Sequence, residues 1–241
     1  MLLKEGRKKM NKNIIWFLFL ISIHLNAQKA SDSLHLNIDV VFGGKPIQLD
    51  SNYISITKDT LSFTTIKFYL SSFEFHFTDN SIYKENNSYH LIDIENPNSK
   101  KISFSKVNFK NKTLKSIQFN IGVDSLMSVS GAMKDALDPT KGMYWAWQSG
   151  YINIKIEGKS LSCNTRKNKF QFHIGGYLEP NYAMRTFNFN FNDNIKKEKN
   201  IVMDLGKLFS EIQLKENNTI MIPGKEAMKL ADLTTEIFFI Q

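Results

Sequence analysis

The stretch "TTIKFYLSSFEFHF", residues 64–77, alternates apolar and polar side chains over most of its length. Such alternation puts the apolar side chains on one face of an extended chain and is typical of a half-buried β-strand. Eight further segments show the same period, separated by polar, Asn-rich turns: residues 33–42, 88–94, 115–123, 150–158, 169–177, 186–192, 200–205 and 235–240. The pattern predicts an all-β fold, a single-domain antiparallel β-sandwich with a few short helices.

Helical periodicity is scarce in the sequence. It favours short helices only over residues 131–137, 205–212 and 224–233. No internal repeat, Pro-rich linker or change of composition divides the chain after residue 27. We therefore expect one domain rather than two.

Residues 1–27 are predicted to form a secretory signal peptide. Five basic side chains precede residue 13, the apolar run "IIWFLFLISI" occupies residues 14–23, and Ala27 is a small residue before the cut. These three features in this order are typical of export signals. The apolar run is shorter than the roughly 20 residues that a membrane-spanning helix needs. We expect a periplasmic or secreted protein without a membrane span, whose mature domain covers residues 28–241.

Export lowers the net charge of the chain. The whole sequence holds 31 Lys and Arg against 23 Asp and Glu, and residues 1–27 contain five of the former and one of the latter. The mature chain therefore carries 26 basic and 22 acidic residues, a net charge of +4. Nucleic-acid grooves need concentrated basic surface interleaved with aromatic side chains, and no segment offers this. We expect no nucleic-acid partner.

Signatures of common enzymes are absent from the sequence. It contains no HExxH, no GxSxG and no phosphate-binding loop, and no pair of carboxylates is marked by spacing for acid–base chemistry. Asp135 and Asp138 leave two interpretations, calcium ligation by loop oxygens or capping of a turn before Pro139. We expect the protein not to be an enzyme.

Cys163 is the single cysteine of the chain. A lone cysteine excludes an intramolecular disulfide framework and any CxxC metal or redox site. In an exported protein two interpretations remain, a disulfide between chains or a half-buried bystander.

Four histidines follow the predicted signal, and each stands on the more polar face of a predicted strand: His35, His76, His90 and His173. They are either ordinary solvent-facing side chains or ligands of a transition metal. An exported protein without paired thiolates must build such a site mainly from imidazole and carboxylate. His173 differs from the others because Gly175 and Gly176 follow it, and glycines allow a neighbouring group to approach the backbone closely.

Two of the three tryptophans, Trp145 and Trp147, stand in "MYWAWQSGY", residues 143–151. In an extended strand they point to the same face. Two interpretations remain open. They are core aromatics, or at least one lies beside His173 in a site. Similarly, Met127, Met133 and Met143 either fill gaps in a core or supply thioether sulfur to copper(I).

Two elements carry a resemblance to a known family, "GMYWAWQSGY" at residues 142–151 and "FHIGGY" at residues 172–177. With the strand order around them, they make the chain from about residue 34 to its C-terminus resemble the MbnP-like family, in the form found in Bacteroidetes. These are exported, copper-associated β-sandwich proteins found beside methanobactin uptake and related systems. The resemblance implies the sandwich fold and copper as the cofactor.

The resemblance also implies roles for particular residues. His173 matches a metal-binding element of the family, and His76 or His90 would supply a second imidazole from a neighbouring strand. Trp145 or Trp147 would lie near the metal and could be oxidised to kynurenine. The partner implied is a di-haem protein of the MauG and cytochrome c peroxidase type. The family's histidine before the aromatic element has no counterpart in "GVDSLMSVSGAMKDALDP", residues 122–139.

The sequence thus predicts an exported, non-enzymatic protein that binds or handles copper, acting with a di-haem peroxidase-like partner. The alternative is an exported binding module that presents its aromatic side chains to a glycan or a protein. Whether the protein binds copper distinguishes these two functions.

Overall fold

The computed structural model describes residues 33–105, 112–131, 133–148, 150–191 and 198–241. Residues 32–241 form one compact unit. The predicted signal peptide lies outside the described residues, so it stays a prediction, as does a domain boundary at residue 28. Within the described part of the chain, no helix is long and apolar enough to cross a membrane.

The smaller of two sheets has the strand order β15-β13-β1-β2, with β7 also paired to β1. β1 pairs in parallel with β13 and antiparallel with β2 and β7. The strands are β1 (Leu34–Phe42), β2 (Lys45–Pro46), β7 (Lys101–Phe104), β13 (Glu198–Asp204) and β15 (Phe238–Ile240).

The larger sheet is organised by β4 (Thr60–Phe77), a strand of 18 residues. The first half of β4 pairs with β10 and its second half with β8, while β3, β6 and β5 also pair with it along its length. The other strands are β3 (Asn52–Ile54), β5 (Ile82–Lys84), β6 (Tyr89–Asp93), β8 (Leu114–Ile121), β9 (Tyr144–Trp145), β10 (Gly150–Ser160), β11 (Lys169–Gly175), β12 (Arg185–Asn190) and β14 (Thr219–Ile220).

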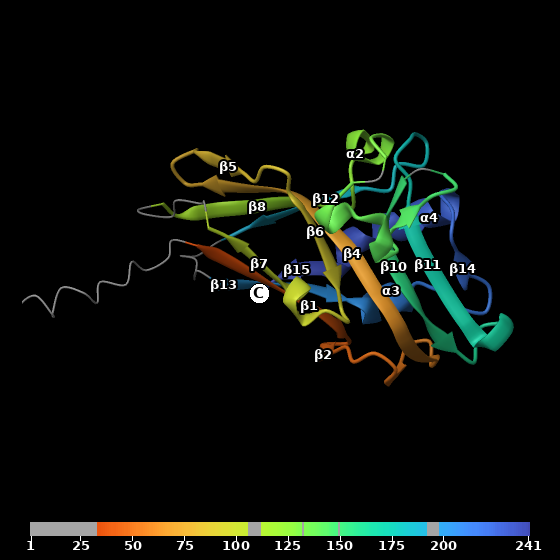
Figure 1. Cartoon of the computed structure of the whole chain (residues 1–241). Helices are drawn as coiled ribbons and strands as arrows, with labels where there is room; N and C mark the ends of the chain where they lie inside the picture. The colour runs from red at the N-terminus through yellow and green to blue at the C-terminus, as the bar shows by residue number, and fades with distance from the viewer. Residues whose placement is uncertain (1–32, 106–111, 132, 149, 192–197) are drawn as a thin grey trace, which may run out of the picture. The chain divides into compact units, whose positions relative to one another are not determined.

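Within the described residues, three short α-helices accompany the sheets: α2 (Ser125–Val129), α3 (Leu205–Ser210) and α4 (Lys225–Ile237). Asp124 caps α2 by accepting a hydrogen bond from the Met127 amide, as carboxylates at helix starts do. α4 buries residues spaced three or four apart, from Ala227 to Ile237, and packs against β11, β12 and α3. Figure 1 shows α4 behind the β10–β11 pair.

Two separate cores hold the fold together. The main core joins apolar side chains of both sheets with those of α3 and α4, among them Leu36, Phe68 and Phe172. A second, smaller cluster contains Tyr69 and Trp145 and lies outside the main core. The larger sheet is therefore covered on both faces, at least where β4 and β10 run.

The fold is mainly β with three short helices, as the alternation of apolar residues predicts. The expected simple antiparallel sandwich needs correction in one respect, because β1–β13 and β11–β14 are parallel pairs and both sheets are mixed. The predicted helix over residues 131–137 is reduced to a single 3-10 turn, Asp135–Leu137.

Cys163 is part of the main core, with a side chain that is 2% exposed. Burial raises the pKa of its thiol to about 11, and the nearby Asp59 carboxylate acts in the same direction. A thiol that is both buried and protonated at neutral pH is a poor nucleophile. The geometry therefore favours the bystander interpretation over a disulfide between chains.

We expect the native protein to react with Ellman's reagent at pH 8 to less than about a tenth of the extent seen in denaturant, because the thiolate is neither formed nor accessible. Thiol titration before and after unfolding measures this. A disulfide-linked dimer on a non-reducing gel of native protein would contradict it.

Candidate functional site

Part of the outer face of the larger sheet is covered by residues 133–148. Tyr69 on β4 donates its hydroxyl hydrogen to the Ala136 carbonyl oxygen at 3.0 Å, and Tyr151 on β10 donates to the Leu137 carbonyl at 2.9 Å. Lys155 Nζ donates to the Gly142 carbonyl at 3.2 Å. Three side chains from the sheet thus hold the backbone of this segment against it.

The two sequence elements that carry the family resemblance, residues 142–151 and 172–177, pack on each other's glycines. A Cβ atom built on Gly175 would lie 2.7 Å from Trp145 Cζ3 and 2.7 Å from the Tyr151 carbonyl oxygen. A Cβ atom on Gly150 would lie 2.7 Å from Tyr177 Cε1. Each glycine therefore leaves the space that an aromatic ring of the other element fills. The close approach expected at Gly175 is made by the Trp145 indole.

Trp145 lies on the same face of β11 as His173. Residues two apart on a strand point to one face and are separated by about 7 Å along it. Gly175, on which the Trp145 indole packs, is two residues beyond His173. His173 is 6% exposed, although the sequence puts it on the more polar face of its strand. That at least one tryptophan lies beside His173 in a site stays a prediction.

His173 is held by a carboxylate of the neighbouring strand. Its Nε2 atom lies 2.6 Å from Glu157 Oε1, and the Lys155 amine lies 3.8 Å from the same oxygen. The hydrogen bond from His173 lowers the pKa of Glu157 to about 2, against the opposing effect of burial. With Nε2 donating to an ionised carboxylate, a neutral imidazole has its lone pair on Nδ1.

Trp147 does not share the environment of Trp145. The chain turns after β9, where the Gln148 amide donates to the Trp145 carbonyl oxygen, so the two indoles do not point to one strand face. Trp145 is 6% exposed and Trp147 is 64% exposed, with ring centroids 6.0 Å apart. The core interpretation therefore suits Trp145, while Trp147 is open to solvent.

His90 and His76 lie away from this cluster. His90 on β6 faces Leu70 on β4, and three strand spacings of about 4.8 Å separate β6 from β11. Its Nε2 atom is 2.8 Å from Glu85 Oε2. Burial acts to raise the pKa of Glu85, but the hydrogen bonds from His90 and Ser88 outweigh it and the net shift is downward.

His76 stands six residues beyond Leu70 on β4, about 20 Å along a regular strand. Its nearest carboxylate oxygen is Glu74 Oε2, at 3.6 Å from Nε2. In the described structure no hydrogen bond or ion pair joins any two of His76, His90 and His173, so a shared centre would need a different arrangement of the strands.

Other predicted candidates have structural roles. Met143 belongs to the second, smaller cluster that contains Tyr69 and Trp145, which we call the outer cluster, and Met127 and Met133 pack against it. Asp138 Oδ1 accepts hydrogen bonds from the Thr140 amide and hydroxyl and so caps the turn that begins at Pro139. His35 lies between the Ser33 and Ser103 hydroxyls in the smaller sheet.

Over the described residues, no group of three or more His, Cys, Asp or Glu side chains is arranged to hold a metal ion. The donor set that copper would require is therefore not assembled from these side chains alone. His173 Nδ1 and the thioethers of Met127, Met133 and Met143 are donors whose chemistry suits copper.

Glu157 is the residue of this site that sequence reasoning missed. Alternation puts it on the outward face of residues 150–158, just as it does His173 on residues 169–177. What brings the two together is the register of β10 and β11, where Glu157 stands opposite Gln171. The alternation within each segment does not reveal how two strands are aligned with each other, so this register could not be predicted.

Comparison with known proteins gives one family and one similar structure. The family model described as MbnP matches residues 31–222. The solved structure of MbnP from Methylosinus trichosporium is similar, with a TM-score of 0.58 and 11% sequence identity, covering 86% of this chain and 97% of that one. At this identity the likeness is one of fold. No curated protein matches the sequence.

The packing of Tyr177 on Gly150 is open to a double-mutant cycle. We expect Gly150→Ala to destabilise the protein by about 1–3 kcal/mol, because the added methyl group overlaps the ring. In a Tyr177→Ala background the same change should cost less than half as much, since the ring is gone. Denaturant unfolding of the four proteins measures the coupling, and equal costs in both backgrounds would contradict the contact.

Proposed function

The chain belongs to the MbnP family, and we propose that it binds or handles copper outside the cytoplasm without being an enzyme. The family is associated with copper, and family members are generally non-catalytic copper-binding proteins. What the proposal adds for this chain is the residue that would bind the metal, the aromatic side chains beside it and the kind of partner.

The observation that carries the proposal is the environment of His173. The imidazole is buried, and Glu157 fixes its Nε2 atom as a donor. The Trp145 indole packs on Gly175, two residues further along the same strand. Metal-binding histidines commonly donate one ring N–H to a carboxylate, which orients the ring and raises the basicity of the other nitrogen. Nδ1 of His173 would then be the copper ligand, with a thioether of the outer cluster as a soft second donor.

His76 and His90 stay proposals as further ligands, but each already has its own carboxylate neighbour on a different part of the sheet. A site that used either together with His173 would require movement of whole strands. The proposal therefore rests on His173, and the copper site we expect has few protein ligands.

Trp147 supports a role for a redox partner. Its indole is exposed, and its ring centroid is 6.0 Å from that of the buried Trp145. The chain has no haem-attachment CxxCH motif, so oxidation of an indole would need an external oxidant. We propose a di-haem protein of the MauG or cytochrome c peroxidase type as that partner, docking over Trp147.

The same exposed indole also favours the alternative function, a binding module for a glycan or protein. Exposed tryptophans are common where proteins bind partners, because one ring offers both apolar area and an N–H donor. A protein that binds no copper would leave this alternative as the better account of Trp147.

We expect His173→Ala to weaken copper binding by at least about tenfold, since losing a ligand costs no less than losing a partner that orients one. Metal analysis and copper titration of the purified protein measure this. His35→Ala is the matched control, because His35 lies in the smaller sheet among serine hydroxyls. Equal titrations for the wild type and His173→Ala would remove His173 from the site.

In protein from the native host with its redox partner expressed, we expect Trp147 rather than Trp145 to become kynurenine, because only Trp147 is exposed. The modified peptide would differ by the loss of one carbon and the gain of one oxygen. Peptide mass spectrometry detects this, with Trp147→Phe as the control. Unmodified tryptophan at both positions would contradict the proposed oxidation while leaving copper binding to its own test.

A further inference from the structure

Two turns lie together at one end of the larger sheet, far along the sequence from each other. One joins β3 to β4 over residues 55–59, and the other follows β10 over residues 161–168. The Ser162 hydroxyl donates to Asp59 Oδ1, which ties the two turns to each other. Both are found at the lower right of Figure 1, at the lower ends of β4 and β11. We call them the paired turns.

The paired turns hold the most exposed large apolar side chains of the described structure. Leu161 is 85% exposed and Ile56 is 81% exposed, and Ile54 beside them is 73% exposed. The small residues next to them in the sequence, Ser160 and Ser55, are buried instead, so the backbone turns these apolar side chains outward. Isolated exposed apolar residues are ordinary, but here two of them stand on turns that are hydrogen-bonded to each other, and the third directly precedes one of these turns.

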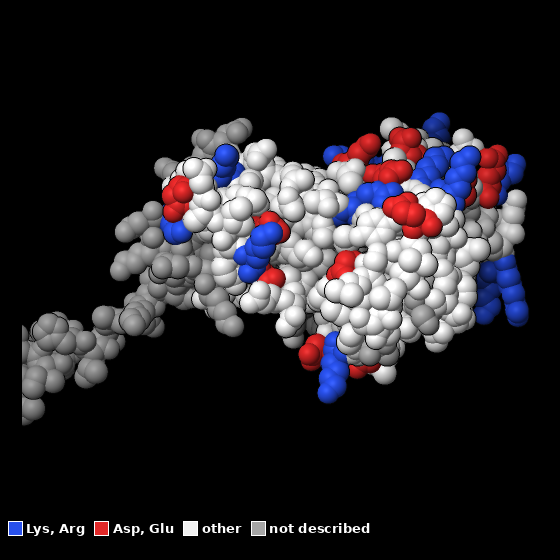
Figure 2. All heavy atoms as spheres, turned by 90° about the horizontal axis from the view of Figure 1, so that it is seen from above, with Lys and Arg blue, Asp and Glu red and all other residues white. Residues whose placement is uncertain are grey.

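Positive charge surrounds these apolar side chains. Residues 54–60 and 158–169 contain five basic side chains, all exposed, and one acidic side chain: Lys58, Lys159, Arg166, Lys167 and Lys169 against Asp59. The Thr57 and Ser162 hydroxyls donate to Asp59. Among the described residues none of the five cations forms an ion pair. By contrast, most basic side chains on the face shown in Figure 2 lie beside acidic ones.

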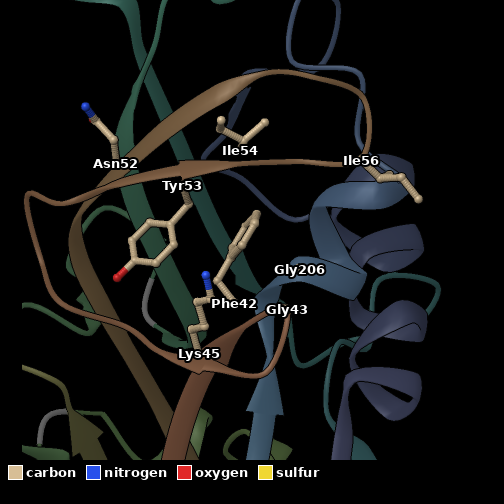
Figure 3. Close-up of a pocket in the computed structure, with 8 residues that line it drawn as sticks. All are labelled: Phe42, Gly43, Lys45, Asn52, Tyr53, Ile54, Ile56 and Gly206. Atoms are coloured by element: carbon tan, nitrogen blue, oxygen red, sulfur yellow. The ribbon is translucent and has the colours of Figure 1, made fainter.

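A cavity of about 520 Å³ adjoins the paired turns and, like them, is lined by apolar side chains and a basic one. Ile54 and Ile56 line it, and so do Phe42 and Tyr53, whose ring centroids are 5.2 Å apart. Figure 3 shows these two rings beside each other, with Lys45 on the hairpin below them. The apolar surface of the turns therefore continues into the protein, and a further amine stands at its edge.

We propose that the paired turns bind the surface of an anionic membrane. Aliphatic side chains on protruding turns can enter the boundary between headgroups and acyl chains, while the lysines around them contact lipid phosphates. Each basic side chain near an anionic surface adds to the attraction, and the total falls with salt. The apolar residues sit on separate tips rather than on one flat patch, which suits a fluid lipid surface better than a rigid protein surface.

The proposal is tested by sedimentation of the purified protein with vesicles. We expect it to bind vesicles of phosphatidylcholine with about one third phosphatidylglycerol, to bind pure phosphatidylcholine vesicles much more weakly, and to be released by salt. Leu161→Ser should reduce the partition coefficient about tenfold, and Lys159→Glu with Lys167→Glu by at least about tenfold. Both changes are at exposed positions, so the core is left intact.

Matched controls separate these effects from general hydrophobicity and charge. Leu126→Ser removes a leucine that is also exposed, on α2, and Lys215→Glu with Lys225→Glu changes the net charge equally at exposed positions elsewhere. Both controls should stay within about twofold of the wild type. Inorganic phosphate at the same phosphate concentration should not displace the vesicles, which distinguishes a lipid surface from a free-anion site.

Several results would overturn the proposal. They are no binding to anionic vesicles, equal losses in the control variants, full competition by inorganic phosphate, or binding to polyglutamate without binding to vesicles. The last result would assign the paired turns to an acidic protein instead. None of these outcomes depends on copper, so the test is independent of the proposed function.

Discussion

Phe68, Tyr69 and Leu70 are consecutive residues on β4, and all three are fully buried. Neighbouring side chains on a strand point to opposite faces, so this run requires both faces of the larger sheet to be covered. The inner face is covered by the main core that the smaller sheet, α3 and α4 complete. On the outer face part of the cover is the segment of residues 133–148, which has little regular structure of its own and is fixed by hydrogen bonds from Tyr69 and Tyr151.

The segment that covers the outer face determines how far the outward polar side chains of β10 and β11 are exposed to water. On an open sheet His173 and Glu157 would be solvated, and their interaction would be weak. Here the side chain of His173 is 7% exposed and that of Glu157 23% exposed, and the two are hydrogen-bonded to each other. Two residues further along β11, the Trp145 indole packs on Gly175. The indole reaches this position only because Gly175 lacks a side chain. Fold and candidate site are therefore linked through one contact between an aromatic ring and a glycine.

The strands and the polar faces of the histidines could be predicted from the sequence, because alternation is a local property of each segment. α3 and α4 agree with the predicted helices to within a few residues. Short pairings such as β2, β5 and β9 were not predictable, since two or three residues carry no period. The burial of His173 could not be predicted either. It depends on a distant segment folding over the sheet and on the register that brings Glu157 to it, neither of which leaves a local pattern.

Holding a buried imidazole against a carboxylate that is only partly exposed costs free energy. Dehydrating the two polar groups is only partly offset by their mutual attraction, and an apolar pair of similar volume would often be as stable or more so. The cost is largest for His173, whose side chain is 7% exposed against 23% for Glu157. In a neutral imidazole whose Nε2 atom donates to the carboxylate, the lone pair is on Nδ1. Under the proposed function, a metal bound through that nitrogen would offset the cost of the pair.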